Sequence, residues 1–230
     1  MITCSVCGTE NGDLAVVCSS CKSYIQSKVD NLNLFETFWG LMETPRGTFK
    51  RIVLARHKNY VLFLSAMLGV SFVYAAIWFE NWGHLFSNVI TLAGLGLLFG
   101  VPVGIAGVIV VSSVVMVVAR MLGGSPSLRN MIAVVAYAGM PVVLALVFVV
   151  PVEIAVFGRY FFDNNPPPLV ISPVIYVVLI GLHGAAWFWS WLLLVEGTVV
   201  AGTLGRLKSA LAGLAIAGVT GCAAYVSRFL

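Results

Sequence analysis

Residues 93–119 read AGLGLLFGVPVGIAGVIVVSSVVMVVA and contain no charged side chain. A helix that spans a bilayer needs about 20 apolar residues, so this stretch predicts a transmembrane helix. Pro102 within it predicts either a kinked helix or a short broken helix that leads into a longer one. Four other stretches are similarly long and apolar, and the sequence therefore predicts an all-α, polytopic transmembrane bundle of about five spans. The expected spans are residues 60–79, 93–119, 131–157, 169–195 and 207–226.

The composition of the whole chain agrees with a membrane location. Of the 230 residues, 60% are hydrophobic and 10% are charged, whereas soluble domains are roughly half apolar and about a quarter charged. A water-soluble fold of this length would leave too much apolar surface exposed. The net charge of +4 is modest, and the basic residues adjoin hydrophobic segments. The expected partner is therefore the lipid bilayer, and no nucleic acid is expected.

The distribution of basic residues predicts the orientation of the bundle. Lys and Arg in short loops favour the cytosolic side of a membrane. With five spans and a cytosolic N-terminus, 11 of the 13 Lys and Arg residues lie in the cytosol. We therefore expect the N-terminus in the cytosol and the C-terminus outside. The first 31 residues lack the apolar segment of a cleavable signal peptide, so their cysteines should stay in a reducing compartment.

Two pairs of cysteines mark the N-terminal region. Cys4 and Cys7 form one Cys-x-x-Cys pair, and Cys18 and Cys21 form a second pair after a gap of ten residues. Doubled pairs of this kind are typical of four thiolates that hold one tetrahedral zinc ion. A disulfide pair and a redox motif are the alternatives, and a reducing compartment disfavours the first of them. Because four thiolates fill the coordination sphere, we expect a zinc-ribbon module at residues 1–31 with one structural zinc ion.

Residues 32–59 join this module to the transmembrane domain at residues 60–230, and they are amphipathic and basic. The apolar residues follow a helical spacing, and Pro45 predicts that one helix ends and another begins there. Basic residues surround the apolar face of the second helix. This pattern is typical of a helix that lies in the membrane interface. It is equally compatible with a helix packed on the cytosolic end of the bundle, and both alternatives stay open.

Three ionisable residues lie within or at the ends of the predicted spans. Charged residues in spans are costly and often functional. Glu153 lies in the third span and His183 in the fourth, whereas Glu196 is expected at the cytosolic interface, where a carboxylate costs little. His183 is either a proton relay or a partner in an interhelical hydrogen bond. The sequence has no paired metal-binding His–Glu motif, no serine elbow and no phosphate-binding loop, so we do not expect an enzyme.

Small residues recur every fourth position in two of the predicted spans. This spacing lets helix backbones approach closely in lipid. The close contact lies either within one bundle or between copies of the chain, and a homo-oligomer is therefore among the expected assemblies. The two sets are Gly96, Gly100 and Gly104, and Gly213, Ala217 and Gly221.

Three stretches together resemble the Yip family (Yip domain) of five-pass membrane proteins. Residues 35–49 read FETFWGLMETPRGTF and end in a proline and a phenylalanine ahead of the first span. The sequence LGGSP at residues 122–126 leads into YAGMP at residues 137–141. The tryptophan-rich fourth span then leads to Gly197 and a final span. The resemblance covers residues 33–230 and implies a five-pass helical fold.

Eukaryotic members of this family are tied to vesicle traffic and to Rab-type GTPases. Their acidic tyrosine–glycine–proline signature ahead of the spans is not found in this sequence. The predicted zinc ribbon takes its place, an arrangement similar to that of prokaryotic members. The resemblance therefore implies the plasma membrane of a prokaryote and gives no ground to expect GTPase binding.

Two functions are compatible with these features. The first is a non-enzymatic membrane scaffold or adaptor that holds a cytosolic protein partner through residues 1–31. The alternative is a transporter or channel for a small solute or ion that uses Glu153 and His183. No inverted repeat is visible, and five spans do not divide evenly, which favours the scaffold.

Overall fold

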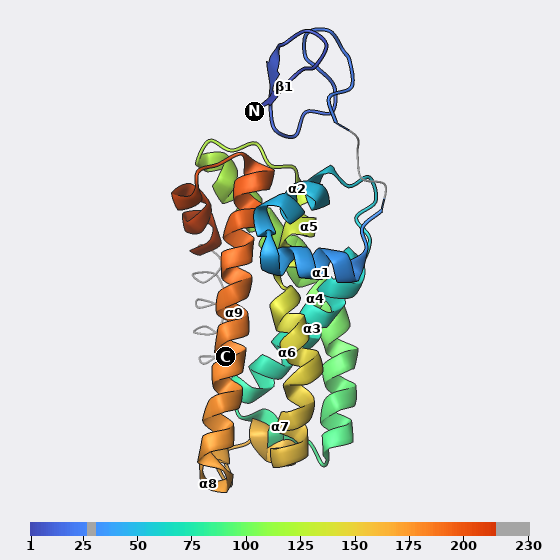
Figure 1. Cartoon of the computed structure of the whole chain (residues 1–230). Coiled ribbons are helices and arrows are strands. Elements are labelled where there is room, and N and C mark those ends of the chain that lie inside the picture. The colour runs from blue at the N-terminus through green and yellow to red at the C-terminus, as the bar shows by residue number, and fades with distance from the viewer. Residues whose placement is uncertain (27–30, 215–230) are drawn as a thin grey trace. The chain divides into compact units, whose positions relative to one another are not determined.

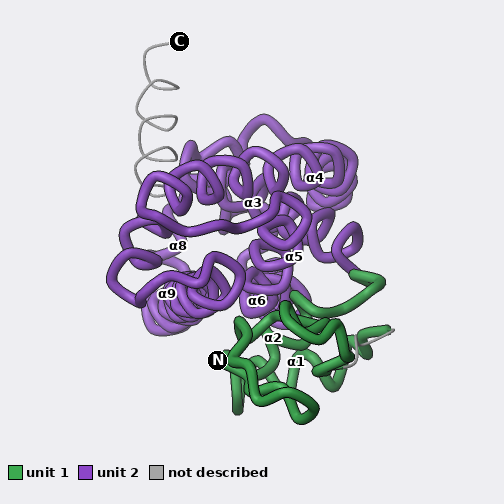
Figure 2. The backbone as a smooth tube through the Cα atoms, turned by 90° about the horizontal axis from the view of Figure 1, so that it is seen from above, with its two compact units in different colours: residues 1–59 green, residues 60–230 purple. Residues whose placement is uncertain are grey.

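The computed structural model describes residues 1–26 and 31–214 of the chain. The chain divides into two compact units, Met1–Asn59 and Tyr60–Leu230 (Figure 2). Within the described residues, four helical stretches are long and apolar enough to cross a membrane, which confirms the predicted all-α membrane fold. These stretches are Val61–Phe79, Val89–Met121, Leu128–Phe162 and Pro173–Gly202.

The first unit begins with a small hairpin. Strand β1 (Ile2–Thr3) pairs antiparallel with strand β2 (Glu10–Asn11). An isolated antiparallel bridge then joins Val17 to Tyr24. A module of this size has almost no apolar core of its own, so its folding calls for a cross-link or a bound metal.

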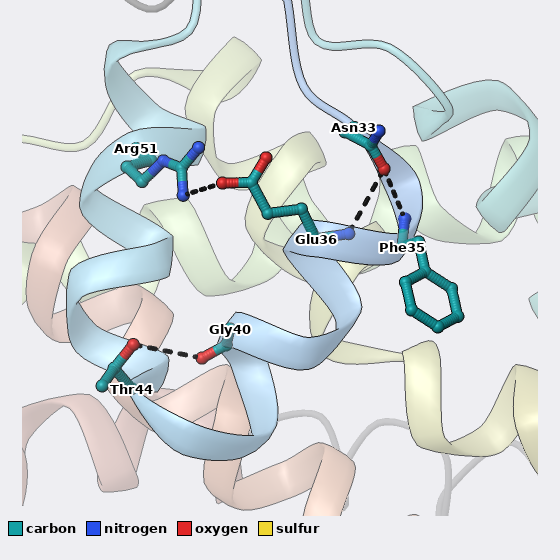
Figure 3. A network of polar contacts seen from close by, with 6 residues as sticks. All are labelled: Asn33, Phe35, Glu36, Gly40, Thr44 and Arg51. Carbon is teal, nitrogen blue, oxygen red and sulfur yellow. Dashed lines mark hydrogen bonds and ion pairs between the residues drawn. The ribbon is translucent and has the colours of Figure 1, made fainter.

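Two short helices, α1 (Leu34–Glu43) and α2 (Pro45–Leu54), follow in the same unit. The side-chain oxygen of Asn33 caps α1, because it accepts hydrogen bonds from two backbone N–H groups of the first turn (Figure 3). Pro45 stands in the first turn of α2, where its missing N–H costs nothing. The predicted restart of the helix at this proline is confirmed.

The two helices pack on each other through a small residue. A Cβ atom added to Gly40 of α1 would lie 2.5 Å from the hydroxyl oxygen of Thr48 on α2. The Thr44 hydroxyl donates to the Gly40 carbonyl oxygen at 3.5 Å, and Glu36 forms an ion pair with Arg51 at 2.8 Å (Figure 3). Both side chains of that pair are more than half exposed, so it contributes at most about 1 kcal/mol.

In the second unit, helices α3 (Val61–Phe79) and α4 (Val89–Met121) pack along each other (Figure 1). Helix α4 runs through Pro102 as one continuous element, so the alternative of a broken second span is wrong. Its three predicted small residues, Gly96, Gly100 and Gly104, are buried against α3. This glycine set is therefore used inside the bundle, and it is not free to join copies of the chain.

The third span is not the single helix predicted for residues 131–157. Pro141 and Pro151 each stand in the first turn of a new helix. A proline has no N–H to donate and its ring crowds the preceding turn, so each proline ends the helix before it. The pieces are α5 (Leu128–Ala138), α6 (Met140–Phe148), α7 (Val150–Phe157) and the 3-10 helix η2 (Gly158–Phe162).

The fourth span differs from its predicted bounds, residues 169–195. Ser172, in an extended conformation, separates the short helix α8 (Pro168–Ile171) from the long helix α9 (Pro173–Gly202). Helix α9 therefore begins and ends later than predicted, and Glu196 lies inside it.

The chain then enters a further helix at residues 206–214. The remainder of the predicted fifth span, up to residue 226, lies outside the described residues, as do Ala217 and Gly221. The predicted contact between copies of the chain through Gly213, Ala217 and Gly221 therefore stays a prediction.

A cluster of aromatic side chains fixes one end of the bundle. Phe161 lies 5.2 Å from Phe162 and 5.7 Å from Tyr176, measured between ring centroids. The indole N–H of Trp78 donates to the Tyr176 hydroxyl at 3.3 Å. A 3-10 helix, η1 (Trp82–Leu85), contacts η2, which carries Phe161 and Phe162. The cluster borders the buried carboxylate of the third span.

Candidate functional site

The four predicted cysteines come together in the N-terminal module. Their sulfur atoms all lie within 4.8 Å of one another. The sulfur of Cys4 is 3.6 Å from that of Cys21, and the sulfur of Cys7 is 3.6 Å from that of Cys18. A tetrahedral zinc site with Zn–S bonds of about 2.3 Å has sulfur–sulfur edges of about 3.8 Å. The cluster therefore has the dimensions of a site for one metal ion.

These distances also separate the metal site from its alternatives. A disulfide bond joins its sulfurs at about 2.05 Å, and all four cysteines are free thiols. Each close sulfur pair joins a cysteine of one Cys-x-x-Cys motif to a cysteine of the other. A redox disulfide would instead form within one motif. The geometry therefore favours one metal ion bound by all four sulfurs over a structural disulfide or a redox disulfide.

The two cysteine turns have the same backbone design. The Cys4 carbonyl accepts a hydrogen bond from the Gly8 N–H at 2.9 Å, and the Cys18 carbonyl accepts one from the Lys22 N–H at 3.2 Å. Gly8 has φ +71° and Lys22 has φ +60°, so both turns close through a left-handed residue. Glycine adopts this conformation without strain. The role of Lys22 was not apparent in the sequence, because lysine carries no signal for positive φ.

Polar neighbours of Cys4 and Cys7 support the thiolate form that a metal requires. The Ser23 hydroxyl lies 3.2 Å from the Cys4 sulfur, and together with backbone N–H groups it lowers the pKa of the Cys4 thiol to about 6. The Thr9 hydroxyl, 3.3 Å from the Cys7 sulfur, lowers the pKa of that thiol as well. The Asn11 amide donates to the Cys18 sulfur at 3.6 Å. These side chains surround the cluster in the way that outer partners orient metal ligands.

The second polar feature lies among the membrane-spanning helices. Glu153 of α7 and His183 of α9 meet at 2.8 Å between Oε1 and Nε2. The Glu153 side chain is 1% exposed and the His183 side chain is 26% exposed. The sequence singled out each residue, but it did not predict that they form a pair. The interhelical hydrogen bond expected for His183 is thus present, with Glu153 as its partner.

Glu196 has a different environment. Its carboxylate forms a 2.8 Å ion pair with Arg206, which is largely exposed. The pair joins the last turns of α9 to the start of the helix at residues 206–214. This position agrees with a structural role at the end of the span, and Glu196 takes no part in the Glu153–His183 pair.

A groove of about 850 Å³ runs between α1 and α2 within the first unit. Phe35 and Trp39 stand one helical turn apart on its rim and are 76% and 56% exposed. The exposed Glu36–Arg51 ion pair crosses it (Figure 3). The predicted apolar face of α2 behaves differently, because Phe49 and Ile52 are fully buried. The apolar surface that this segment leaves free is therefore on α1.

Comparison with known protein families shows which family the chain belongs to. The family model for the Yip1 domain matches residues 39–227, which include all four described membrane helices. The chain belongs to the Yip1 domain family. A search of curated proteins and a search of solved structures each gave no significant match.

The matched residues contain the glycine–proline stretch and the tryptophan-rich stretch that carried the resemblance, and they include the first stretch from residue 39 onward. In YAGMP, Gly139 and Pro141 form the junction between α5 and α6, and a Cβ added to Gly139 would lie 2.5 Å from the Leu68 side chain. In LGGSP, Gly124 packs on the end of α9, where its added Cβ would lie 2.9 Å from the Gly202 carbonyl oxygen. The cysteine cluster precedes the matched residues, so it is an addition to the Yip1 domain.

Proposed function

We propose that this Yip1-domain protein is a non-enzymatic membrane scaffold whose N-terminal module holds a cytosolic protein partner. The observation that carries the proposal is the four-cysteine cluster directly ahead of a membrane domain. Four thiolates leave no open position on a tetrahedral metal, so such a site stabilises a fold and does not activate substrate. A metal-folded module linked in sequence to a membrane bundle is suited to contacts with other proteins.

Zinc is the metal that this donor set favours. Soft thiolates in a tetrahedral arrangement select zinc or iron, and zinc is the usual occupant of structural Cys₄ sites. The matched pairs Cys4–Cys21 and Cys7–Cys18 would each lie along an edge of the tetrahedron. One ion would then join both cysteine turns, and it would contribute the folding energy that the module lacks in its core.

The module presents apolar side chains that its own fold does not cover. Val6, Val17 and Tyr24 are 71%, 41% and 82% exposed, respectively. Apolar and aromatic residues of this kind form the centres of protein interfaces. We propose a cytosolic location for this surface because of the distribution of basic residues between the spans. The cysteine module ahead of the Yip1 domain, an arrangement similar to that of prokaryotic members, supports the plasma membrane of a prokaryote. The exposed Phe35 and Trp39 of α1 support an additional contact with the membrane interface.

A double substitution in this apolar surface should abolish binding of the partner. Replacing Val6 and Tyr24 together with serine removes exposed apolar area and leaves all four cysteines in place. Proteins that co-purify with the full-length chain should be lost from this variant and from a chain that lacks residues 1–31. Quantitative mass spectrometry of the purified complexes measures the loss.

The control is Ser20→Ala, an exposed position in the same module. It should retain both the partner and the metal. If the Val6 and Tyr24 variant kept every partner while the truncated chain lost them, the contact would lie elsewhere in the module. If the truncated chain also kept them all, the adaptor proposal would be wrong.

A transporter of small solutes or ions is the second candidate. The observation that favours it is the Glu153–His183 pair between two membrane-spanning stretches. In proteoliposomes, such a transporter would give a flux that Glu153→Gln abolishes. Vesicles that stay tight with the native chain would reject transport, and the adaptor proposal would be unaffected.

A further inference from the structure

A cavity of about 260 Å³ lies beside the Glu153–His183 pair, within the second unit. Residues of α3, α6, α7, η2 and α9 line it. Because a water molecule takes about 30 Å³ in the liquid, the cavity has room for a small solute. Its lining combines a buried carboxylate with five aromatic side chains. The aromatic members are Tyr74, Trp78, Phe161, Phe162 and Trp187.

The pair lies well inside the apolar part of the bundle. His183 stands ten residues after the start of α9 at Pro173, which is about 15 Å along the helix axis at 1.5 Å per residue. Glu153 is almost completely buried. A carboxylate that carries an uncompensated charge in such a place costs several kcal/mol. The pair should therefore be neutral overall when the cavity holds no ion.

A carboxylate beside a neutral imidazole carries one negative charge. A neutral pair must therefore hold one additional proton. That proton resides either on His183, as an imidazolium facing a carboxylate, or on Glu153, as a carboxylic acid facing the imidazole. The 2.8 Å contact accommodates both forms. Loss of this one proton leaves a single negative charge at the edge of the cavity. A monovalent cation in the cavity would neutralise it.

Other ionisable groups around the cavity do not supply this compensation. Among the described residues that line it, Tyr74 is the remaining titratable group, and its hydroxyl donates to the Ala93 carbonyl oxygen at 3.1 Å. Arg159 lies on η2, but its guanidinium donates to the Phe86 carbonyl oxygen and does not line the cavity. Glu153 and His183 are thus the acidic and basic side chains that meet in this lining.

We propose that this cavity binds a small organic ammonium ion in exchange for one proton of the Glu153–His183 pair. Aromatic faces attract alkylammonium ions, and the carboxylate provides the opposite charge. One positive charge enters as one proton leaves, so the charge of the site is unchanged. A metal ion fits the lining less well, because Mg²⁺ and Ca²⁺ need about six or more oxygen ligands. The described lining residues offer one carboxylate, one imidazole and the hydroxyl groups of Ser71 and Tyr74, which is fewer than six oxygen ligands.

This inference goes beyond the adaptor role and does not require transport. It is tested by binding to the full-length chain, purified in detergent, with no membrane gradient and no protein partner. Tetramethylammonium chloride is the probe, and sodium chloride at equal ionic strength is the reference. Isothermal titration in two buffers of different ionisation enthalpy measures both the affinity and the protons released.

Saturable binding of tetramethylammonium with release of about one proton is the expected result. The affinity should rise about tenfold per pH unit over the range in which the pair holds its proton. Glu153→Gln should weaken binding by at least about thirtyfold, because it removes the buried charge. Glu196→Gln, which changes the other carboxylate of these spans, should bind as the native chain does.

Three outcomes would overturn the proposal. They are the absence of saturable binding to the native chain, binding without proton release, and equal binding by the Glu153→Gln variant. The proton count uses the native chain, so it decides the question even if the variant fails to fold. A failure here would leave the adaptor proposal intact, since that proposal concerns residues 1–31.

Discussion

Replacing Cys18 and Cys21 together with serine is expected to release about one zinc ion per chain. The two cysteines contribute half of the sulfurs in the cluster, and each lies 3.6 Å from a sulfur of the other cysteine pair. Zinc binding to small modules of this kind has an apparent free energy of about 10–16 kcal/mol. The module should therefore unfold when the metal is lost. Metal analysis by mass spectrometry gives the zinc content, and limited proteolysis of residues 1–26 reports the unfolding.

The rest of the chain provides the controls for this experiment. The membrane-spanning helices belong to the compact unit Tyr60–Leu230, and the cysteines belong to the other unit, so the variant should still insert into the membrane. Ser20→Ala should keep its full zinc content, as should the native chain after mild washing. A strong chelator should reproduce the effect of the double variant on proteolysis. Unchanged metal content in the double variant would contradict the assignment of these ligands, and iron in place of zinc would correct the metal.

The cysteine cluster was predictable because its determinants are local. All four ligands lie within 18 residues, and the spacing of each pair dictates the turn that holds it. Gly8, directly after the first pair, is a residue type suited to the positive φ that it adopts. The sequence could not identify Lys22, which adopts the same conformation in the second turn. The hydrogen bonds of that turn impose the conformation, and they do not depend on the type of side chain.

The bounds of the spans were less predictable, because hydropathy does not report where a helix is interrupted. The residues around Pro141 and Pro151 are as apolar as their neighbours, so the third span looked continuous. Pro102, in contrast, does not interrupt its helix, since α4 continues through it. A proline inside an apolar run thus marks either a break or an uninterrupted helix. Packing of the neighbouring helices decides between them.

The pairing of Glu153 with His183 lay beyond the sequence for a related reason. The residues are 30 positions apart, on different helices. The residues of α9 are apolar on all faces of the helix, so its sequence has no polar face that would indicate how the helix is rotated in the bundle. The third span is also interrupted twice ahead of Glu153, at Gly139 and Val149. Neither factor can be read from spacing alone.

Gly104→Ala is expected to destabilise the Yip1 domain strongly, although it adds one methyl group. The new Cβ would lie 2.6 Å from the Gly69 backbone nitrogen and would also clash with the Ser65 carbonyl oxygen. These are backbone atoms, which cannot turn aside as a flexible side chain can. Overpacking of this kind costs about 3 kcal/mol, which corresponds to a fall of about 6–12 °C in the thermal midpoint. Thermal unfolding of the purified protein in detergent measures the shift.

Gly107→Ala is the matched control, because it adds the same methyl group one turn further along α4. Nothing lies within 4 Å of a Cβ at that position. Alanine is the better helix former by about 1 kcal/mol, so this variant should be as stable as the native chain or more stable. Opposite signs for the two variants would establish that α3 and α4 meet through their backbones. Equal effects would show that helix propensity dominates, and the close packing of Gly69 against Gly104 would then be wrong.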